Sequence, residues 1–352
     1  MSTKNASIIT KKNIILAGPC SAESEEQLIT TAQQLAREGK TDILRAGIWK
    51  PRTSPGQFEG IGTRALSWLL KAKEQTGLAT AVEVATPKHI EDALNFDVDV
   101  LWVGARTTVN PFSVQQLADA LRGTNQTILI KNPVNTDIKL WIGAVERFQK
   151  VGITNIGLIH RGFTSYSESV YRNPPVWQIP IEMKRLLPEL PMIIDPSHIC
   201  GNRENLKSIV QKSVDLDYDG IMIETHCAPE QALTDKAQQI RPRELSELLE
   251  QIIWKRATNG NEDFIHQLSY LREEINQLDD DLLQLLANRM QISQRIGTIK
   301  KEHNTTVLQS NRWAEVIDRN LIKAQKLALD ESFVRQYLEA IHLESIRRQN
   351  LL

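Results

Sequence analysis

Two hydrophobic periodicities divide the chain. From about residue 13 to 257, short apolar runs alternate with longer segments in which apolar residues recur every three or four positions. The short runs predict buried strands, and the longer segments predict amphipathic helices. From residue 262 onward the helical spacing continues without a proline and with one glycine, Gly297. The pattern therefore predicts two parts of different architecture.

The first part contains eight predicted strands, at residues 13–18, 42–49, 79–85, 100–105, 127–133, 155–161, 192–197 and 220–226. A helical segment follows each strand, and several of these segments end at a glycine that is typical of a helix C-cap. Strands that alternate with helices form a parallel sheet. Eight such units fit the roughly 250 residues of a (β/α)8 TIM barrel. We predict this α/β barrel over residues 1–257, with a doubly wound open sheet as the competing arrangement.

The polar segment RATNGNED, residues 256–263, predicts a linker to a separate all-α domain over residues 262–352. Three helices are expected there, from 262 to about 303, from about 310 to 328 and from about 331 to 350. Apolar residues of the first helix alternate in steps of three and four, at 268, 271, 275, 278, 282, 285, 292, 296 and 299. This heptad seam is typical of a dimerising coiled coil. Arg289 also falls on the seam, and a buried cation requires an anion, which favours an anionic ligand in the bundle.

Composition excludes several classes of function. The net charge of −1 provides no general attraction for nucleic acid or for an anionic membrane. No apolar run is long enough to span a bilayer, and the N-terminus lacks the apolar segment of a signal peptide. Three cysteines, Cys20, Cys200 and Cys227, do not make a disulfide scaffold. We expect a cytoplasmic protein that binds neither nucleic acid nor membrane.

Charged and metal-binding side chains gather at the carboxyl ends of the predicted strands, where TIM-barrel active sites lie. The residues there are Cys20, Arg45, Lys50, Glu83, Arg106, Lys131, Arg161, Asp195, His198, Glu224 and His226. Each cation alone is more often part of a surface ion pair. Together, in a chain that is almost neutral, they predict a substrate with several negative charges.

Six segments carry a resemblance to a known family: AGPCSAES, LRAGIWKPRTSPGQFEG, VGARTT, IKNP, DPSHICG and DGIMIETHCAPEQALTDKAQQI. They resemble the type I 3-deoxy-D-arabino-heptulosonate 7-phosphate (DAHP) synthases over residues 13–257. The resemblance implies a condensation of phosphoenolpyruvate with erythrose 4-phosphate at a divalent metal, the first committed step towards the aromatic amino acids.

The resemblance implies four metal ligands, Cys20, His198, Glu224 and Asp235. One thiolate, one imidazole and two carboxylates suit Mn²⁺, Fe²⁺, Co²⁺ or Zn²⁺ better than Mg²⁺ or Ca²⁺, and Mn²⁺ is the expected ion. The metal would polarise the aldehyde of erythrose 4-phosphate. His226 is expected either to support this site or to serve the fold alone, and Cys200 is expected to have no role.

The resemblance also implies the substrate contacts. The phosphoenolpyruvate ligands would be Arg45, Lys50, Arg106, Lys131 and Arg161, with Arg106 and Arg161 on the phosphate. The erythrose 4-phosphate ligands would be Pro51, Arg52, Thr53 and Asp195. Lys50, Glu83 and Lys131 are the expected catalytic residues, Glu83 as the group that orients the attacking water. The segment KPRTS favours a four-carbon sugar, because synthases that use a five-carbon aldose carry a KANRSS-like segment there.

The segment LREEINQLDDDLLQLLANRMQISQRIGTIKKEH resembles the first helix of the all-helical chorismate mutases. The matching residues are Arg272, Arg289, Lys300, Gln309, Arg312, Ser345 and Gln349. Conversion of chorismate to prephenate needs no metal or nucleophile, only a clamped dicarboxylate and hydrogen bonds to the breaking ether, here from Lys300 and Gln349. The family implies an intertwined homodimer in which Arg272 reaches into the partner's site. Gln309 departs from the acidic residue that is frequent in the family, which puts full mutase activity in doubt.

Two alternatives stay open. The helical tail could be a ligand-sensing dimerisation module on a synthase with one activity, although Lys300 and Gln349 favour catalysis. The barrel could act on a longer aldose phosphate, which KPRTS disfavours. Because the first strand begins near residue 13, we expect feedback control to act through the tail, with prephenate as the inhibitor and a homodimer or larger homo-oligomer as the assembly.

Overall fold

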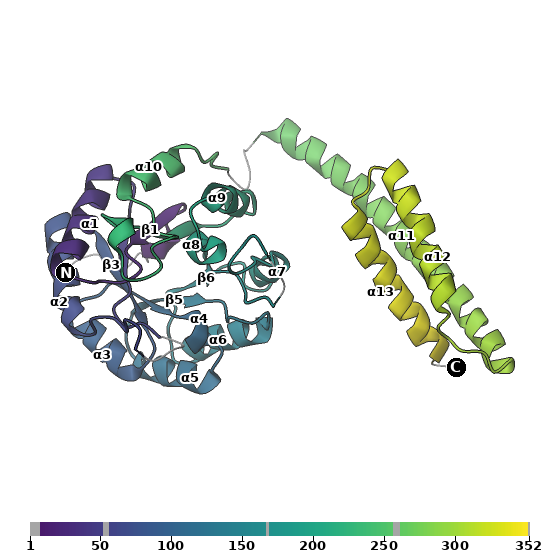
Figure 1. Cartoon of the computed structure of the whole chain (residues 1–352), viewed down its shortest axis with the longest axis horizontal. Coiled ribbons are helices and arrows are strands. Elements are labelled where there is room, and N and C mark those ends of the chain that lie inside the picture. The colour runs from purple at the N-terminus through teal and green to yellow at the C-terminus, as the bar shows by residue number, and fades with distance from the viewer. Residues whose placement is uncertain (1–7, 52–55, 167–168, 256–260, 351–352) are drawn as a thin grey trace. The chain divides into compact units, whose positions relative to one another are not determined.

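The computed structural model describes residues 8–51, 56–166, 169–255 and 261–350. The chain divides into two compact units with the boundary between residues 257 and 258. Figure 1 shows a ring of strands surrounded by helices in the first unit and helices alone in the second. The predicted sugar-phosphate ligands Arg52 and Thr53 fall outside the described residues.

Eight parallel strands close a barrel in the order of the chain, which confirms the predicted fold and excludes the open sheet. The strands are β1 (Ile14–Gly18), β2 (Ile43–Ala46), β3 (Ala79–Val84), β4 (Val100–Val103), β5 (Thr127–Lys131), β6 (Ile156–His160), β7 (Met192–Ile194) and β8 (Gly220–Glu224). β1 pairs with β8 from Ile14 opposite Gly220 to Gly18 opposite Glu224. This register brings the residues that follow β1 close to the carboxyl end of β8.

Helices and short turns connect the strands. They are η1 (Ile8–Thr10), α1 (Glu25–Glu38), α2 (Arg64–Thr76), α3 (Pro87–Asn95), α4 (Ala105–Thr108), α5 (Pro111–Ala120), α6 (Ile138–Lys150), α7 (Gln178–Leu186), α8 (Pro196–Cys200), α9 (Leu206–Asp215), η2 (Pro229–Gln231) and α10 (Pro242–Glu250). The predicted strands ran one to three residues too far at most carboxyl ends. Residues 195–197 show why: Asp195 caps α8 through its side chain and Pro196 begins that helix.

Alternation along the strands produces two hydrophobic cores. Ile14 and Leu16 of β1 point into the barrel, where they pack with residues such as Trp102 and Met222. The intervening residues of the strands face the helices and form the larger core. Ile9 of η1 belongs to the inner core. The barrel interior is thus packed with side chains, and the polar groups are left for the ends of the strands.

The helical unit contains α11 (Glu262–Glu302), α12 (Ser310–Lys326) and α13 (Glu331–Asn350), close to the three predicted helices. Along α11, the buried residues are the small Ser293 and Gly297. A Cβ at Gly297 would lie 3.0 Å from the Cα of Gln349, so α11 and α13 are in close contact there. No helix in the described ranges is long and apolar enough to cross a membrane.

The heptad seam of α11 is exposed in the single chain, and this corrects the expectation that Arg289 is buried. The seam residues Leu271, Ile275, Leu278, Leu282, Leu285, Ile292, Ile296 and Ile299 are each at least 44% exposed. Arg289 is also exposed. The reason is that α13 packs against the small residues Ser293 and Gly297 of α11.

Candidate functional sites

A cavity of about 410 Å³ opens at the carboxyl ends of the barrel strands. Its lining includes nine predicted site residues, which are Cys20, Lys50, Pro51, Glu83, Arg106, Lys131, Arg161, His198 and Asp235. Arg45, Asp195 and Glu224 are not among the lining residues, and each is almost fully buried. Both substrates expected from the sequence are phosphates, and this cationic lining suits them.

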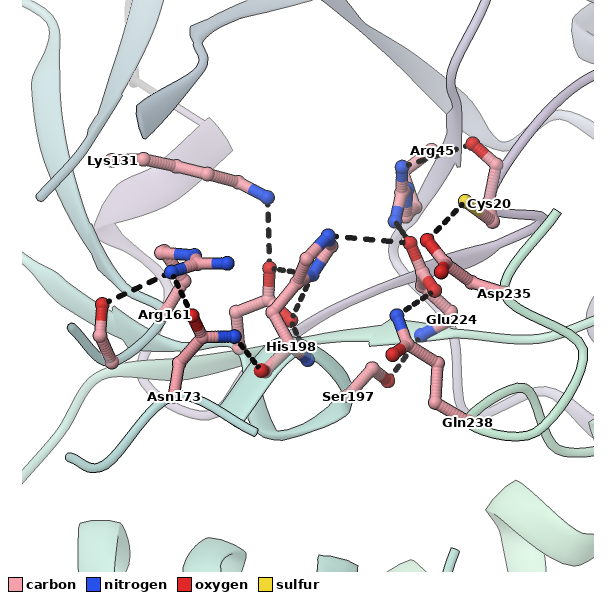
Figure 2. Close-up of polar contacts among 12 residues, drawn as sticks. Cys20, Arg45, Lys131, Arg161, Asn173, Ser197, His198, Glu224, Asp235 and Gln238 are labelled. Carbon is pink, nitrogen blue, oxygen red and sulfur yellow. Dashed lines mark hydrogen bonds and ion pairs between the residues drawn. The ribbon is translucent and has the colours of Figure 1, made fainter. Parts of the chain in front are cut away.

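Three of the four predicted metal ligands form a compact group. One donor atom each from Cys20, Glu224 and Asp235 lies within 4.8 Å of the other two. The fourth, His198, stands beside the group, with its Nε2 3.8 Å from Oε1 of Glu224 (Figure 2). A thiol, two carboxylates and an imidazole are the donors of a divalent transition metal, so these residues fit such an ion.

Each of the three clustered ligands also has a cation. Nη1 of Arg45 donates to Oε1 of Glu224 at 2.9 Å, and both side chains are at most 1% exposed. Nζ of Lys50 lies 3.3 Å from Sγ of Cys20. Nη1 of Arg172 lies 3.1 Å from Oδ1 of Asp235. Each of the three side chains is thus in contact with its own cationic group.

These surroundings shift the pKa values of two ligands in opposite directions. Burial raises the pKa of the Cys20 thiol, the charge of Glu224 acts in the same direction and Lys50 opposes them, and together they raise that pKa to about 12. Burial also acts to raise the pKa of Glu224, but His198, Arg45 and Lys50 outweigh it and lower that pKa to about 2. Glu224 is thus an anion at neutral pH, and Cys20 holds its proton until a metal replaces it.

Asp195 connects two other predicted site residues. One oxygen accepts from Nζ of Lys131 at 2.8 Å, and the carboxylate accepts from Nδ1 of His198 at 2.9 Å. His198 and Lys131 hold the pKa of Asp195 well below its usual value although burial opposes this. Because these contacts use its oxygens inside the barrel, a contact between Asp195 and a sugar hydroxyl stays a prediction.

Arg161 directly follows β6 and Arg106 belongs to α4, and both line the cavity. Nη1 of Arg161 donates to Oδ1 of the buried Asn173 at 2.8 Å (Figure 2), and Nη1 of Arg106 donates to the carbonyl oxygen of Pro51 at 3.1 Å. Burial lowers the pKa of Arg161, Asp195 opposes this, and the charges of Arg172 and Arg106 add to the lowering, so that the pKa falls to about 10. Three guanidinium groups that repel one another favour the binding of an anion among them.

Trp102 lies beneath the cavity and positions several of its polar groups. Its indole Nε1 donates to Oε2 of Glu83 at 3.0 Å, and Arg45 lies over its ring at 5.0 Å. Glu83 also depends on Gly104, where a Cβ would be 2.1 Å from Oε1. Gly104 is therefore the residue that leaves room for Glu83.

Several neighbours of the site were not found from the sequence. Arg172 and Asn173 follow β6 in a loop without periodicity, and Gln238 lies in the loop after η2.

His226 lies past the end of β8 and accepts a hydrogen bond from Ala228 N at 2.9 Å. Its Nε2 also lies 3.8 Å from Oε2 of Glu23. Among the described residues it has no hydrogen bond or ion pair with Glu224, and a role in support of the metal site stays a prediction.

A second cavity of about 650 Å³ lies within the helical unit. Six of the seven residues predicted for chorismate line it, namely Arg289, Lys300, Gln309, Arg312, Ser345 and Gln349. Trp313 and His342, which the sequence did not single out, line it as well, with their rings stacked 4.0 Å apart. The lining combines cations, amides and apolar side chains, as a ring-bearing dicarboxylate requires.

Contacts of α11 with α13 and with the loop after α11 hold the cationic and amide groups of this cavity. Nη1 of Arg289 donates to Oγ of Ser345 at 2.5 Å, and Nζ of Lys300 donates to the carbonyl oxygen of Val307 at 2.5 Å. Nε2 of Gln349 donates to Oγ of Ser293 at 3.1 Å. The predicted residues of α11 and α13 are thus brought together across one helix pair.

Arg272 is the predicted residue that this cavity does not include. It lies on α11, seventeen residues before Arg289. At a rise of about 1.5 Å per residue, that separation corresponds to roughly 25 Å along the helix. Arg272 is therefore too far along α11 to join Arg289 within one chain.

Comparison with known proteins assigns both units. The model of the DAHP synthetase I family matches residues 3–262, and the model of chorismate mutase type II matches residues 271–350. The phospho-2-dehydro-3-deoxyheptonate aldolase of Thermotoga maritima is 29% identical over 238 residues, which are 68% of this chain and 68% of the relative. A 2-dehydro-3-deoxyphosphooctonate aldolase of Geobacter sp. is 28% identical over 260 residues, covering 68% of this chain and 90% of the relative.

The barrel has a counterpart among solved structures. The crystal structure of the phospho-2-dehydro-3-deoxyheptonate aldolase (DAHP synthase) of Thermotoga maritima superposes with a TM-score of 0.60 at 28% identity. The match covers 68% of this chain and 67% of that one. With its closed barrel and its helical C-terminal unit, the chain belongs to the DAHP synthetase I family and is a bifunctional enzyme of aromatic biosynthesis, a DAHP synthase joined to a chorismate mutase domain.

Proposed function

We propose that the barrel catalyses a metal-dependent condensation of phosphoenolpyruvate with erythrose 4-phosphate to give DAHP and phosphate. The observation that carries the proposal is the group of Cys20, Glu224 and Asp235 beside His198, next to a cationic cavity. These four residues would hold the ion, with Mn²⁺ as the expected metal. When bound, the metal would supply Lewis-acid polarisation of the aldehyde.

The side chains of the cavity suggest how phosphoenolpyruvate is bound and how the attacking water is oriented. Arg106 and Arg161 would bind the phosphate of phosphoenolpyruvate, because a guanidinium group matches two phosphate oxygens at once. Lys50 and Lys131 would hold the carboxylate, so that C3 of phosphoenolpyruvate faces the aldehyde carbon. Glu83 would orient the water that attacks C2 before phosphate leaves. The buried Arg45 would hold Glu224 in place through its ion pair with that carboxylate.

A four-carbon aldose is the proposed second substrate. Pro51 lines the cavity, and the sequence at residues 50–54, KPRTS, is the form that favours erythrose 4-phosphate. The similarity to an octulosonate synthase leaves the five-carbon aldose as the competing substrate. Measurement of phosphoenolpyruvate consumption with each aldose phosphate distinguishes the two.

Removal of the metal tests the two activities in one preparation. A strong chelator is expected to abolish the consumption of phosphoenolpyruvate, because the aldehyde is then not polarised, and Mn²⁺ is expected to restore it. Chorismate consumption should be unchanged, since that rearrangement needs no metal. Synthase activity that survives complete removal of the metal contradicts the proposed metal site. Mutase activity that is lost with the metal contradicts the proposal that the helical unit works without one.

For the helical unit we propose the conversion of chorismate to prephenate. Arg289 and Arg312 would bind carboxylates, and Lys300 and Gln349 would donate hydrogen bonds to the breaking ether oxygen, where charge develops. Nε2 of Gln349 and Nζ of Lys300 donate to protein oxygens in the structure, so each is a donor that can turn to the substrate. Gln309 would accept the bond of the substrate hydroxyl through its amide oxygen.

We propose further that the helical unit forms a homodimer through the heptad seam of α11. The exposed seam is apolar along most of the helix, and such a surface in water favours association. A second copy would also supply the Arg272 that each chain cannot bring to its own cavity. The proposed dimer thus completes the site.

The proposed regulator of the synthase is prephenate, bound in the mutase cavity. It carries the charges that Arg289, Lys300 and Arg312 accommodate, and it is the product of the second activity. Binding there would change the arrangement of the dimer and lower the synthase rate. This proposal needs no site beyond the two cavities described.

A further inference from the structure

Arg172 links the two carboxylates of the proposed metal site. It lies in the loop between β6 and α7 and lines the barrel cavity. Its Nη1 donates to Oδ1 of Asp235 and to Oε1 of Gln238, each at 3.1 Å. Gln238 in turn donates from Nε2 to Oε2 of Glu224 at 2.7 Å (Figure 2). One guanidinium group is thus bound directly to Asp235 and, through one amide, to Glu224.

Asp235 depends on such a contact more than the other ligands do. Glu224 is the last residue of β8, and Cys20 follows β1 by two residues. Asp235 lies in a loop and has φ of +45°, a conformation that non-glycine residues adopt rarely. Its Oδ2 lies 3.5 Å from Sγ of Cys20. Arg172 therefore binds Oδ1 of Asp235, and Oδ2 of the same carboxylate faces the other ligands.

The position of Arg172 is itself determined by α8. Its backbone N donates to the carbonyl oxygen of Cys200 at 3.3 Å, and its stem passes so close to Gly201 that a Cβ there would lie 2.6 Å from Cβ of Arg172. The next residue, Asn173, donates from Nδ2 to the carbonyl oxygen of His198 at 2.6 Å. Arg172 is thus anchored to the helix that carries His198.

The contribution of Arg172 is one of orientation more than of charge. Its side chain is 52% exposed, and water screens an ion pair at such a position. The positive charge of Arg172 would also repel a bound metal ion, whereas an Asp235 carboxylate held in a fixed orientation would favour binding of that ion. Water weakens the repulsion between Arg172 and the ion but leaves the hydrogen bond to Asp235 in place. We therefore expect the orienting effect to outweigh the repulsion.

We propose that Arg172 is a positioning residue of the metal site, which presents the Asp235 carboxylate to the ion together with Cys20 and Glu224. The inference rests on the proposed metal-dependent function. Residues that hold metal ligands in place typically change metal affinity by 10- to 100-fold when they are replaced. Since solvent reaches Arg172, the lower end, roughly tenfold, is expected here.

The test measures metal binding without substrate. Full-length protein freed of metal is titrated with Co²⁺ alone, and the absorption of the thiolate–cobalt bond reports binding at Cys20. Arg172→Met is expected to bind Co²⁺ about tenfold more weakly than the wild type but with the same absorption band. Arg172→Lys keeps a donor and is expected to recover part of the affinity.

Arg203→Met is the matched control. Arg203 donates to the carbonyl oxygen of Lys236, next to Asp235, at 3.1 Å, and within the described residues it has no hydrogen bond to a ligand. It should bind Co²⁺ as the wild type does. Equal affinity of Arg172→Met and wild type overturns the positioning role, and so does an equal loss in Arg203→Met. A wild type that does not bind Co²⁺ overturns the proposed metal site itself.

Discussion

Arg45 and Glu224 show how the synthase site is built at the scale of single residues. Both charges are almost fully buried, and they are paired at 2.9 Å. Two ions are costly to remove from water, and hydrogen bonds from Gln238 to Oε2 of Glu224 and from Nη2 of Arg45 to the carbonyl oxygen of Cys20 offset part of this cost. Nε of Arg45 has no hydrogen-bond partner among the described residues. Removal of one partner leaves the other as an uncompensated buried charge. This asymmetry makes the pair a sensitive point for stability.

Arg45→Met is expected to lower the free energy of unfolding of the barrel by about 3–5 kcal/mol, the usual cost of breaking a buried ion pair. Urea unfolding followed by circular dichroism, with a chelator present, measures the change. The double variant Arg45→Met with Glu224→Gln has no buried charge left over and should recover much of the loss. If the double variant is no more stable than Arg45→Met, the loss of stability comes from the lost packing of Arg45 and not from the unpaired charge.

At the scale of elements, the mutase cavity depends on how closely α11 approaches α13. Gly297 is a position of close approach, since a Cβ there would meet backbone and stem atoms of Gln349. In an isolated helix, alanine would be favoured over glycine by about 1 kcal/mol. The glycine is therefore explained by packing and not by helix propensity.

Gly297→Ala is expected to move Gln349 away from its place in the cavity. Displacements of about 1 Å in a site cost up to roughly 100-fold in rate, so kcat/KM for chorismate should fall by about 10- to 100-fold with the synthase rate unchanged. The exposed neighbour Thr298 provides the control, and Thr298→Ala should retain mutase activity. An unchanged mutase in Gly297→Ala would mean that the helix contact does not position Gln349.

The strands and helices follow from patterns of short range, and most could be predicted. The end of β7 could also have been placed, because the Asp-Pro pair at 195–196 is a helix start that can be read in the sequence. Arg172 could not be found in this way. Its partner Asp235 is 63 residues away, and no periodicity connects two loops. The exposure of Arg289 was missed for another reason: a heptad seam does not say whether its own chain or a second chain covers it.

At the scale of the whole molecule, two enzymes share one chain, and each has its own cavity. The product of the proposed synthase reaction, DAHP, is not chorismate, the substrate of the mutase, so the covalent link passes no substrate directly. Control of one unit by a ligand of the other is the use that we propose for the link. If a ligand of one unit alters the other, linkage requires the reverse effect by the same factor.

Prephenate is expected to inhibit the synthase of the full-length chain at concentrations that fill the mutase cavity. Arg289→Met removes a cation of that cavity and should shift the inhibition to higher prephenate concentration by about tenfold or more, the usual scale for a charged hydrogen bond. Synthase rates recorded across a prephenate titration measure both effects. Equal inhibition of the wild type and of Arg289→Met would place the regulatory site elsewhere.

The contact of each clustered side chain with its own cationic side chain bears on how the proposed metal would be loaded. Structural zinc domains stay unfolded until the ion arrives, because nothing else gathers their ligands. Here contacts with Arg45, Lys50 and Arg172 hold the three proposed ligands. Synthesis and folding can therefore be completed before metallation. The ion would enter a finished protein and could be exchanged as supply changes, so the metal found in the enzyme would reflect the metals available during growth.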